Sequence, residues 1–114
     1  MLVKDLVKEF DLSIAAGKNG LDREVMDGYC GDLLSEIMGN APAGCAWMTV
    51  QGHQNVMNVA QMREMAAVVL TNGIVPDDET RQRAEDFGIP LIIWQSTSYD
   101  FAVKLSAAGI PGSS

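Results

Sequence analysis

The chain has few of the residues that most metal sites and catalytic sites require. Its 114 residues include one histidine and two cysteines, and aromatic residues make up only 6%. Cys30 and Cys45 lack the close CxxC spacing of a zinc or redox motif, and two cysteines are too few for a secreted disulfide scaffold. We expect both thiols to be reduced and buried. The sequence therefore predicts no metal and no cofactor.

Positive charge is also scarce, with 8 basic residues against 15 acidic ones and a net charge of −7. Such a field repels phosphate backbones and anionic lipids, so nucleic acid and membrane surfaces are poor partners. No apolar run approaches the roughly 20 residues that cross a bilayer, and the opening segment MLVKDLVKEF carries acids inside its apolar pattern, unlike a signal peptide. We expect a cytoplasmic protein.

Two nucleotide-binding motifs are missing. The glycines that follow LSIAA do not form GxxxxGK[ST], the loop that cradles a triphosphate, and no GxGxxG follows a strand-like segment. These absences count against a nucleotide hydrolase or kinase of familiar design.

The pattern of apolar runs predicts the fold. A hydrophobic fraction of 47% and a charged fraction of 20% are ordinary for a globular domain, and the length suits a single domain over residues 1–114. From Cys45 onward, the runs CAWMTV, AAVVL and PLIIW are each followed by polar residues and a helical segment. Alternation of strand and helix implies a parallel sheet. We expect an α/β fold with a small, mostly parallel sheet and helices on both faces.

Local signals place several helix ends. LVKDLVKEF has the apolar spacing of an amphipathic helix, and LSIAA reads as a short strand. In DLLSEIMG, Asp32 is placed to cap a helix and Gly39 to follow its end. Further along, Asp77 is placed to cap another helix, which Gly88 should end in a left-handed conformation.

The segment NVMNVAQMREMA allows two interpretations. Its apolar residues form one arc of a helix, and Met57 and Met65 flank that arc. Methionines of this kind either fill gaps in a core or form a soft contact surface, so Met57 and Met65 are candidates for a subunit interface. Arg63 falls inside the arc, and its side chain must reach water or a carboxylate.

Polar side chains follow the three expected strands at the point where each strand ends. Because ligands of parallel sheets bind beyond the carboxyl ends of the strands, these loops are the candidate ligand site. Loops at the carboxyl ends of the strands could hold an uncharged or anionic small molecule through backbone amides at helix N-termini. The same residue types also serve turns and caps, and both interpretations stay open. The candidate ligand-binding residues are Gln51, His53, Gln54, Asn55, Thr71, Asn72, Gln95, Ser96 and Thr97.

Catalysis is the weakest interpretation. His53 would need a nucleophile to activate and a third group to orient it, and the spacing reveals neither. A single histidine after a strand more often caps or packs, although Cys30 or Cys45 could approach it in space. We therefore expect a protein that is not an enzyme.

The order of these features resembles a known family. The segments GLDREVMDGYCGDLLSEIMGNA and AWMTVQGHQNVMNVAQMREMAAVVLTNGIVPDDETRQRAEDFGIPLI, which together cover nearly the whole chain, are similar to the DRTGG domain, named for its Asp-Arg-Thr-Gly-Gly motif. Asp22 and Arg23 match the start of that motif. The residues EVMDG replace Thr-Gly-Gly, which leaves Gly28 as the matching glycine.

The resemblance carries expectations about function. Domains of this family resemble the N-terminal domain of HPr kinase/phosphorylase and occur in phosphotransacetylases and beside CBS domains in regulatory pyrophosphatases, where the catalytic machinery lies elsewhere. It therefore implies a regulatory or dimer-forming module. Single-domain members of anaerobic bacteria occur with iron-only hydrogenase components, which implies a protein partner in redox or energy metabolism.

Three hypotheses follow from the sequence. The first is a non-catalytic, homodimeric regulatory module that binds a small metabolite or nucleotide at the ends of the strands. The second is an interaction or scaffold subunit without a ligand. The third, and least favoured, is a small enzyme that uses His53.

Overall fold

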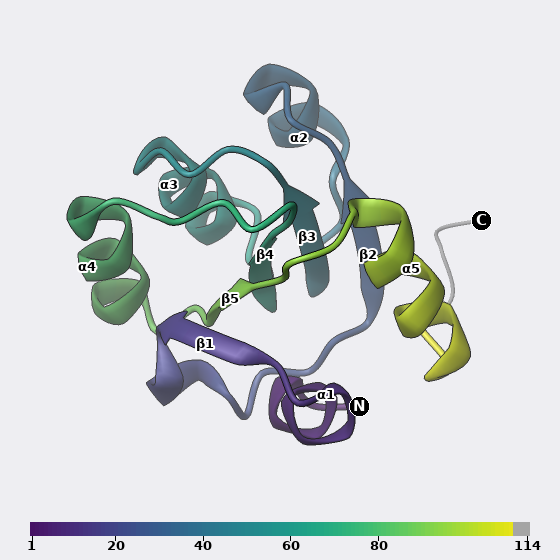
Figure 1. Ribbon diagram of the computed structural model, residues 1–114. Coiled ribbons are helices and arrows are strands. Elements are labelled where there is room, and N and C mark those ends of the chain that lie inside the picture. The colour runs from purple at the N-terminus through teal and green to yellow at the C-terminus, as the bar shows by residue number, and fades with distance from the viewer. Residues whose placement is uncertain (111–114) are drawn as a thin grey trace.

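The computed structural model describes residues 1–110, and its centre is a five-stranded sheet with the strand order β1-β5-β4-β3-β2 (Figure 1). Strands β2 to β5 run parallel, whereas β1 pairs with β5 in the antiparallel direction at one edge. The expected mostly parallel sheet is confirmed. The strands are β1 (Ser13–Ala16), β2 (Asp27–Cys30), β3 (Cys45–Thr49), β4 (Ala67–Leu70) and β5 (Leu91–Ile93).

Helices cover both faces of the sheet (Figure 1), as the sequence predicts. The α-helices are α1 (Val3–Phe10), α2 (Leu34–Asn40), α3 (Asn55–Met62), α4 (Asp78–Phe87) and α5 (Ser98–Ala107), and a short 3-10 helix spans Lys18–Gly20. Helices α2, α3 and α4 contribute to one apolar cluster, and α1 and α5 to the other. Among residues 1–110, no helix combines the length and the apolar character that a bilayer crossing requires.

The alternation of side chains along β3 explains the two clusters. Every residue of this interior strand is buried, and Cys45 and Trp47 belong to one cluster while Ala46 and Met48 belong to the other. Successive side chains of a strand point to opposite faces, so a strand covered on both faces is apolar throughout. This is why CAWMT reads as a continuous apolar run instead of an alternating one.

Helix α4 has the ends that the sequence predicts. The side chain of Asp77 accepts a hydrogen bond from the backbone N–H of Thr80 at 2.8 Å, as an N-cap does. At the other end, Gly88 adopts a left-handed conformation with φ of 64°. Ile89 and Pro90 then lead directly into β5.

Helix α2 differs from the prediction at both ends. It begins at Leu34 after the N-cap Leu33, and Gly39 lies inside the helix instead of after it. Asp32 does not cap α2. Its carboxylate instead accepts hydrogen bonds from the Thr49 hydroxyl at 2.8 Å and from the Val50 N–H at 2.9 Å, because both groups lie at the end of the neighbouring strand β3.

Two of the methionines of the α3 region, Met57 and Met65, are core residues, whereas Met62 is 67% exposed. Met57 and Met65 are 0% exposed, so the prediction that they form a subunit interface is wrong for this fold: neither side chain reaches the surface. Helix α3 stops at Met62, which leaves Met65 in the connection to β4. Among residues 1–110, Arg63 forms no ion pair with a carboxylate, and its guanidinium instead donates to the carbonyl oxygen of Ala41.

Candidate functional site

The three polar loops of the candidate site lie on one edge of the sheet. In the register of the sheet, Thr49 at the end of β3 pairs with Leu70, and Leu70 pairs with Ile93 at the end of β5. The residues that follow these strands therefore leave the sheet at the same edge. We call this the carboxyl edge; it is formed by the loops after β3, β4 and β5.

The loops after β4 and β5 are joined to each other. The N–H of Asn72 donates to the carbonyl oxygen of Ser96 at 2.7 Å, and the Thr71 and Ser98 hydroxyls lie 3.0 Å apart. Gln95 also approaches the first loop, since a Cβ atom on Gly73 would lie 2.8 Å from its Oε1. The structure thus brings these predicted residues together.

The loop after β3 extends in two directions. Gln51 turns toward the end of β2, where its side-chain amide donates to the carbonyl oxygen of Asp32 at 3.2 Å. The rest of the loop leads to α3, and its Gly52 carbonyl accepts a hydrogen bond from the Thr80 hydroxyl of α4 at 2.8 Å. Among the described residues, no side-chain hydrogen bond joins Gln51 to the loops after β4 and β5.

Several predicted site residues act as caps. His53 Nδ1 accepts a hydrogen bond from the N–H of Asn55 at 3.2 Å, in the first turn of α3. The Thr97 hydroxyl accepts one from the N–H of Asp100 at 3.2 Å and caps α5, while the Ser96 hydroxyl donates to the Asp100 carboxylate. Gln54 is the N-cap residue of α3, and its Oε1 is buried without a partner among the described residues.

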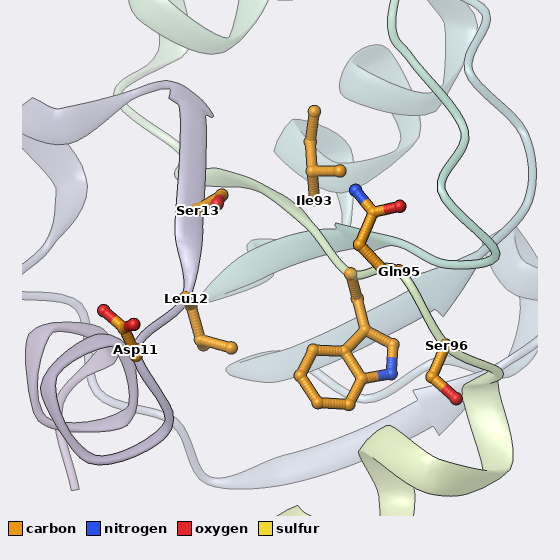
Figure 2. Close-up of a pocket in the computed structure, with 7 residues that line it drawn as sticks. Asp11, Leu12, Ser13, Ile93, Gln95 and Ser96 are labelled. Carbon is orange, nitrogen blue, oxygen red and sulfur yellow. The ribbon is translucent and has the colours of Figure 1, made fainter.

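The sequence did not reveal a hollow at the β1 end of the carboxyl edge. This β1–β5 pocket has a volume of about 220 Å³ (Figure 2). It forms because β1 runs antiparallel to β5, which brings the start of β1 beside the end of β5. Its lining residues are Asp11, Leu12, Ser13, Ile93, Trp94, Gln95 and Ser96. Only Gln95 and Ser96 were predicted, because nothing in the sequence indicates which strand pairs with β5.

Three carboxylates, those of Asp32, Asp77 and Asp100, lie in or next to the loops of the carboxyl edge. Asp77 caps α4, and hydrogen bonds from Thr80, first from its hydroxyl and then from its N–H, hold the pKa of Asp77 below its usual value. The Asp32 carboxylate accepts hydrogen bonds in the loop after β2, and the Asp100 carboxylate accepts one from Ser96 in the first turn of α5. Within residues 1–110, His, Cys, Asp and Glu side chains nowhere form a group of three or more that could hold a metal ion.

The two thiols have the wrong chemistry for a nucleophile beside His53. Cys45 begins β3, whereas His53 follows the other end of that strand. Burial raises the pKa of Cys45 to about 12, and burial also raises the pKa of Cys30. A nucleophilic cysteine needs the opposite shift, toward the thiolate.

The residues of the Asp-Arg motif lie away from the carboxyl edge. The Arg23 guanidinium contacts the C-terminal end of α4, which precedes β5. Asp22 forms an exposed ion pair with Lys4 at 2.9 Å. Gly28 lies in β2, where an added Cβ would meet the Leu105 side chain of α5 at 3.1 Å. These positions give the motif a structural role.

Comparison with solved structures shows a likeness at the level of the fold. No protein-family model and no curated protein matches the chain. The fold is similar to the crystal structure of the CBS and DRTGG domains of the regulatory region of Clostridium perfringens pyrophosphatase, complexed with its activator diadenosine tetraphosphate. The TM-score is 0.68 at 13% sequence identity, over 96% of this chain and 47% of the length of that one. The likeness supports, at the level of the fold, the resemblance of this chain to a DRTGG-like domain.

Proposed function

We propose that this chain is a non-catalytic regulatory domain that binds a small nucleotide or related metabolite at the carboxyl edge of its sheet. The observation that carries the proposal is that the polar loops after β3, β4 and β5 leave the sheet at one edge, where the last two are hydrogen-bonded to each other. Ligands of open parallel sheets bind at this edge. The similar solved structure is a regulatory region that holds a nucleotide activator, which supports the same class of ligand here.

The charges at this edge favour the less charged part of such a ligand. The carboxylates of Asp32, Asp77 and Asp100 lie in or next to the loops, and the hydrogen bonds described there involve no lysine or arginine. A polyphosphate would meet repulsion that a base, a sugar or an uncharged metabolite would not. Amide and hydroxyl groups are suited to bind these neutral parts.

A thermal-shift measurement tests the proposal. We expect at least one member of a panel of adenosine, AMP, ATP, diadenosine tetraphosphate and uncharged metabolites to raise the melting temperature. Saturation at 100 times Kd stabilises a protein by about 2.7 kcal/mol, which is several degrees for a domain of this size. Absence of any shift across the panel at millimolar concentrations would refute ligand binding.

Matched variants locate the binding. Gln51→Ala and Gln95→Ala remove exposed amides at two ends of the carboxyl edge, and Gln82→Ala removes an exposed amide from α4. We expect a reduced ligand-induced shift in at least one of the first two and an unchanged shift in the third. An equal reduction in all three would place the ligand elsewhere.

A second part of the proposal is self-association through the edge strand β2. The outer side of β2 pairs with no strand of the described chain, and Met26 and Leu33, on either side of it in sequence, are 67% and 68% exposed. Unpaired strand edges beside exposed apolar side chains are typical of contact surfaces. These residues replace Met57 and Met65 as the candidate interface.

Light scattering during size-exclusion chromatography tests this part. We expect a mass of twice the 12.3 kDa chain, and a lower mass for the double variant Met26→Gln/Leu33→Gln. Val75→Gln is the control, because Val75 is 70% exposed but follows β4 instead of β2. A monomer at all concentrations, or an unchanged mass in the double variant, would refute an interface at β2.

A further inference from the structure

The β1–β5 pocket has one wall from each of two segments that are far apart in sequence. Asp11, Leu12 and Ser13 lie on the β1 side, and Ile93, Gln95 and Ser96 lie on the β5 side (Figure 2). The Leu12 side chain extends between the two walls (Figure 2), and Asp11 is exposed to solvent. The pocket therefore has an apolar centre with polar groups around it.

The aromatic part of the lining is held in place. The indole N–H of Trp94 donates to the carbonyl oxygen of Thr97 at 3.1 Å. The Trp94 ring also packs edge-on against Phe101, with 5.2 Å between the ring centroids, and the Lys104 ammonium lies 6.0 Å from its centroid. A ring fixed by these contacts loses little further freedom when a ligand binds beside it.

Three polar side chains of the lining remain available to a ligand. Asp11, Ser13 and Gln95 make no side-chain hydrogen bond or ion pair with any other residue of the described chain. By contrast, the Ser96 hydroxyl is already bound to Asp100. The available groups supply an amide that both donates and accepts, a hydroxyl, and a carboxylate that only accepts.

We propose that the β1–β5 pocket binds an adenine-type base, meaning a planar heterocycle with an exocyclic amino group beside a ring nitrogen. The inference rests on the proposed ligand binding at the carboxyl edge and names the part of the ligand that this chain recognises. A volume of about 220 Å³ suits one heterocycle better than a drug-sized molecule, which needs roughly 300 Å³ or more.

The chemistry of the lining favours this base over others. A glutamine amide pairs with the amino group and adjacent ring nitrogen of adenine, whereas guanine is read by arginine or lysine. Neither of those two residue types lines the pocket. The rings of Trp94 and the side chain of Leu12 give a heterocycle the apolar and aromatic contact by which bases bind proteins.

The same lining assigns no role to phosphate. Asp11 is the one charged residue among the seven that line the pocket, and its carboxylate repels a phosphate group. The Lys104 ammonium, 6.0 Å from the Trp94 ring centroid, is not among the lining residues. We therefore expect AMP to bind no more tightly than adenosine. Inosine, which has a carbonyl in place of the amino group, should bind at least about tenfold more weakly than adenosine.

Titration of the ¹⁵N-labelled full chain with adenosine, inosine and AMP, followed by NMR, tests the inference. We expect saturable shifts of the Gln95 side-chain amide and of the Trp94 indole N–H. If the loop amides of Gln51 and Asn72 shift but the Gln95 side-chain amide and the Trp94 indole N–H do not, the pocket assignment is overturned. Binding at the carboxyl edge would then still stand. Equal affinity for adenosine and inosine would overturn the assignment of the base.

Two variants test the pocket directly. Ser13→Leu adds volume at an exposed position of the pocket wall, and we expect it to weaken adenosine binding at least about tenfold. Ser106→Leu makes the same change in a second hollow, beside α5, and should leave binding unchanged. Gln95→Leu keeps the size of the side chain and should abolish the preference for adenosine over inosine. If folded Ser13→Leu binds adenosine as tightly as the parent chain, the inference is refuted. If the parent chain binds no ligand at all, both the inference and the proposed function are refuted.

Discussion

The guanidinium of Arg23 donates through Nε to the carbonyl oxygen of Gly88 at 2.7 Å. Its two other nitrogens lie 3.3 Å from the carbonyl oxygen of Phe87 and 3.5 Å from that of Met65. The last carbonyl groups of a helix lack partners within the helix, and a cation is favourable at this negative end. Arg23 thus joins the N-terminal segment to the end of α4 and to the connection before β4.

Removal of Arg23 should destabilise the fold. Arg23→Ala leaves partly buried carbonyl groups at the end of α4 unpaired, and we expect a loss of about 2 to 3 kcal/mol in the free energy of unfolding. Arg23→Lys should lose less, because it keeps the charge but not the fork of donors. Urea denaturation measures both changes.

Arg81→Ala is the control, since its ion pair with Asp78 is exposed, and it should change stability by less than about 0.5 kcal/mol. Equal losses for Arg23→Ala and Arg81→Ala would show that the contact with Gly88 adds nothing.

Two glycines of the chain should respond in opposite directions to alanine. A Cβ on Gly20 would lie 2.0 Å from the carbonyl oxygen of Gly88, so Gly20→Ala forces the backbones apart and should cost about 2 kcal/mol or more. A Cβ on Gly39 meets nothing within 4 Å, and Gly39 lies inside α2. Gly39→Ala should therefore stabilise the protein by about 0.5 to 1 kcal/mol. Thermal melts of the two variants decide this, and a destabilised Gly39→Ala would contradict the extent of α2.

The sequence predicted those parts of the fold that depend on neighbouring residues. The cap by Asp77 and the left-handed end at Gly88 follow from interactions within a few residues, and both are confirmed. The buried strands β3, β4 and β5 were likewise legible as short apolar runs between polar loops. Their common direction followed from the alternation with helices.

The parts that the sequence could not predict depend on contacts between distant segments. Asp32 has the right position for a helix cap, but the unpaired groups at the end of β3 lie close to it in space and take its carboxylate instead. Met65 continues the helical pattern, yet the chain must leave α3 to enter β4. For the same reason the β1–β5 pocket was missed: Trp94 and Leu12 meet only because β1 joins the sheet beside β5.

The carboxylate of Asp77 should make stability depend on acidity. Its pKa in the folded protein is lowered from 3.8, chiefly by the hydrogen bond from the Thr80 hydroxyl, with the Thr80 N–H adding to the effect. A lowered pKa stabilises the folded state above the unfolded value, and this contribution is lost as the pH falls through the folded value. Asn caps a helix without titrating. The difference in melting temperature between the parent and Asp77→Asn should therefore shrink between about pH 5 and pH 2. A constant difference over this range would refute the contribution.

The two cysteines should differ in reactivity toward a disulfide reagent such as dithiobis-nitrobenzoate. Cys45 is 0% exposed and burial raises its pKa to about 12, so almost no thiolate is present and no reagent reaches it. Cys30 is exposed, although partial burial of its sulfur and the charge of Asp32 raise its pKa. At pH 8 we expect only Cys30 to react in the folded protein, more slowly than free cysteine.

The thiol of Cys45 should react only when the chain unfolds. Cys30→Ser should abolish the reaction of the folded protein, and Cys45→Ala should leave it unchanged, with the absorbance of the released thiolate as the measurement. In urea, both cysteines of the parent chain become equivalent, because unfolding removes the burial that separates them. Reaction of two thiols in the folded parent would mean that β3 opens to solvent, since Cys45 begins this interior strand and contacts the core formed by α2 and α3.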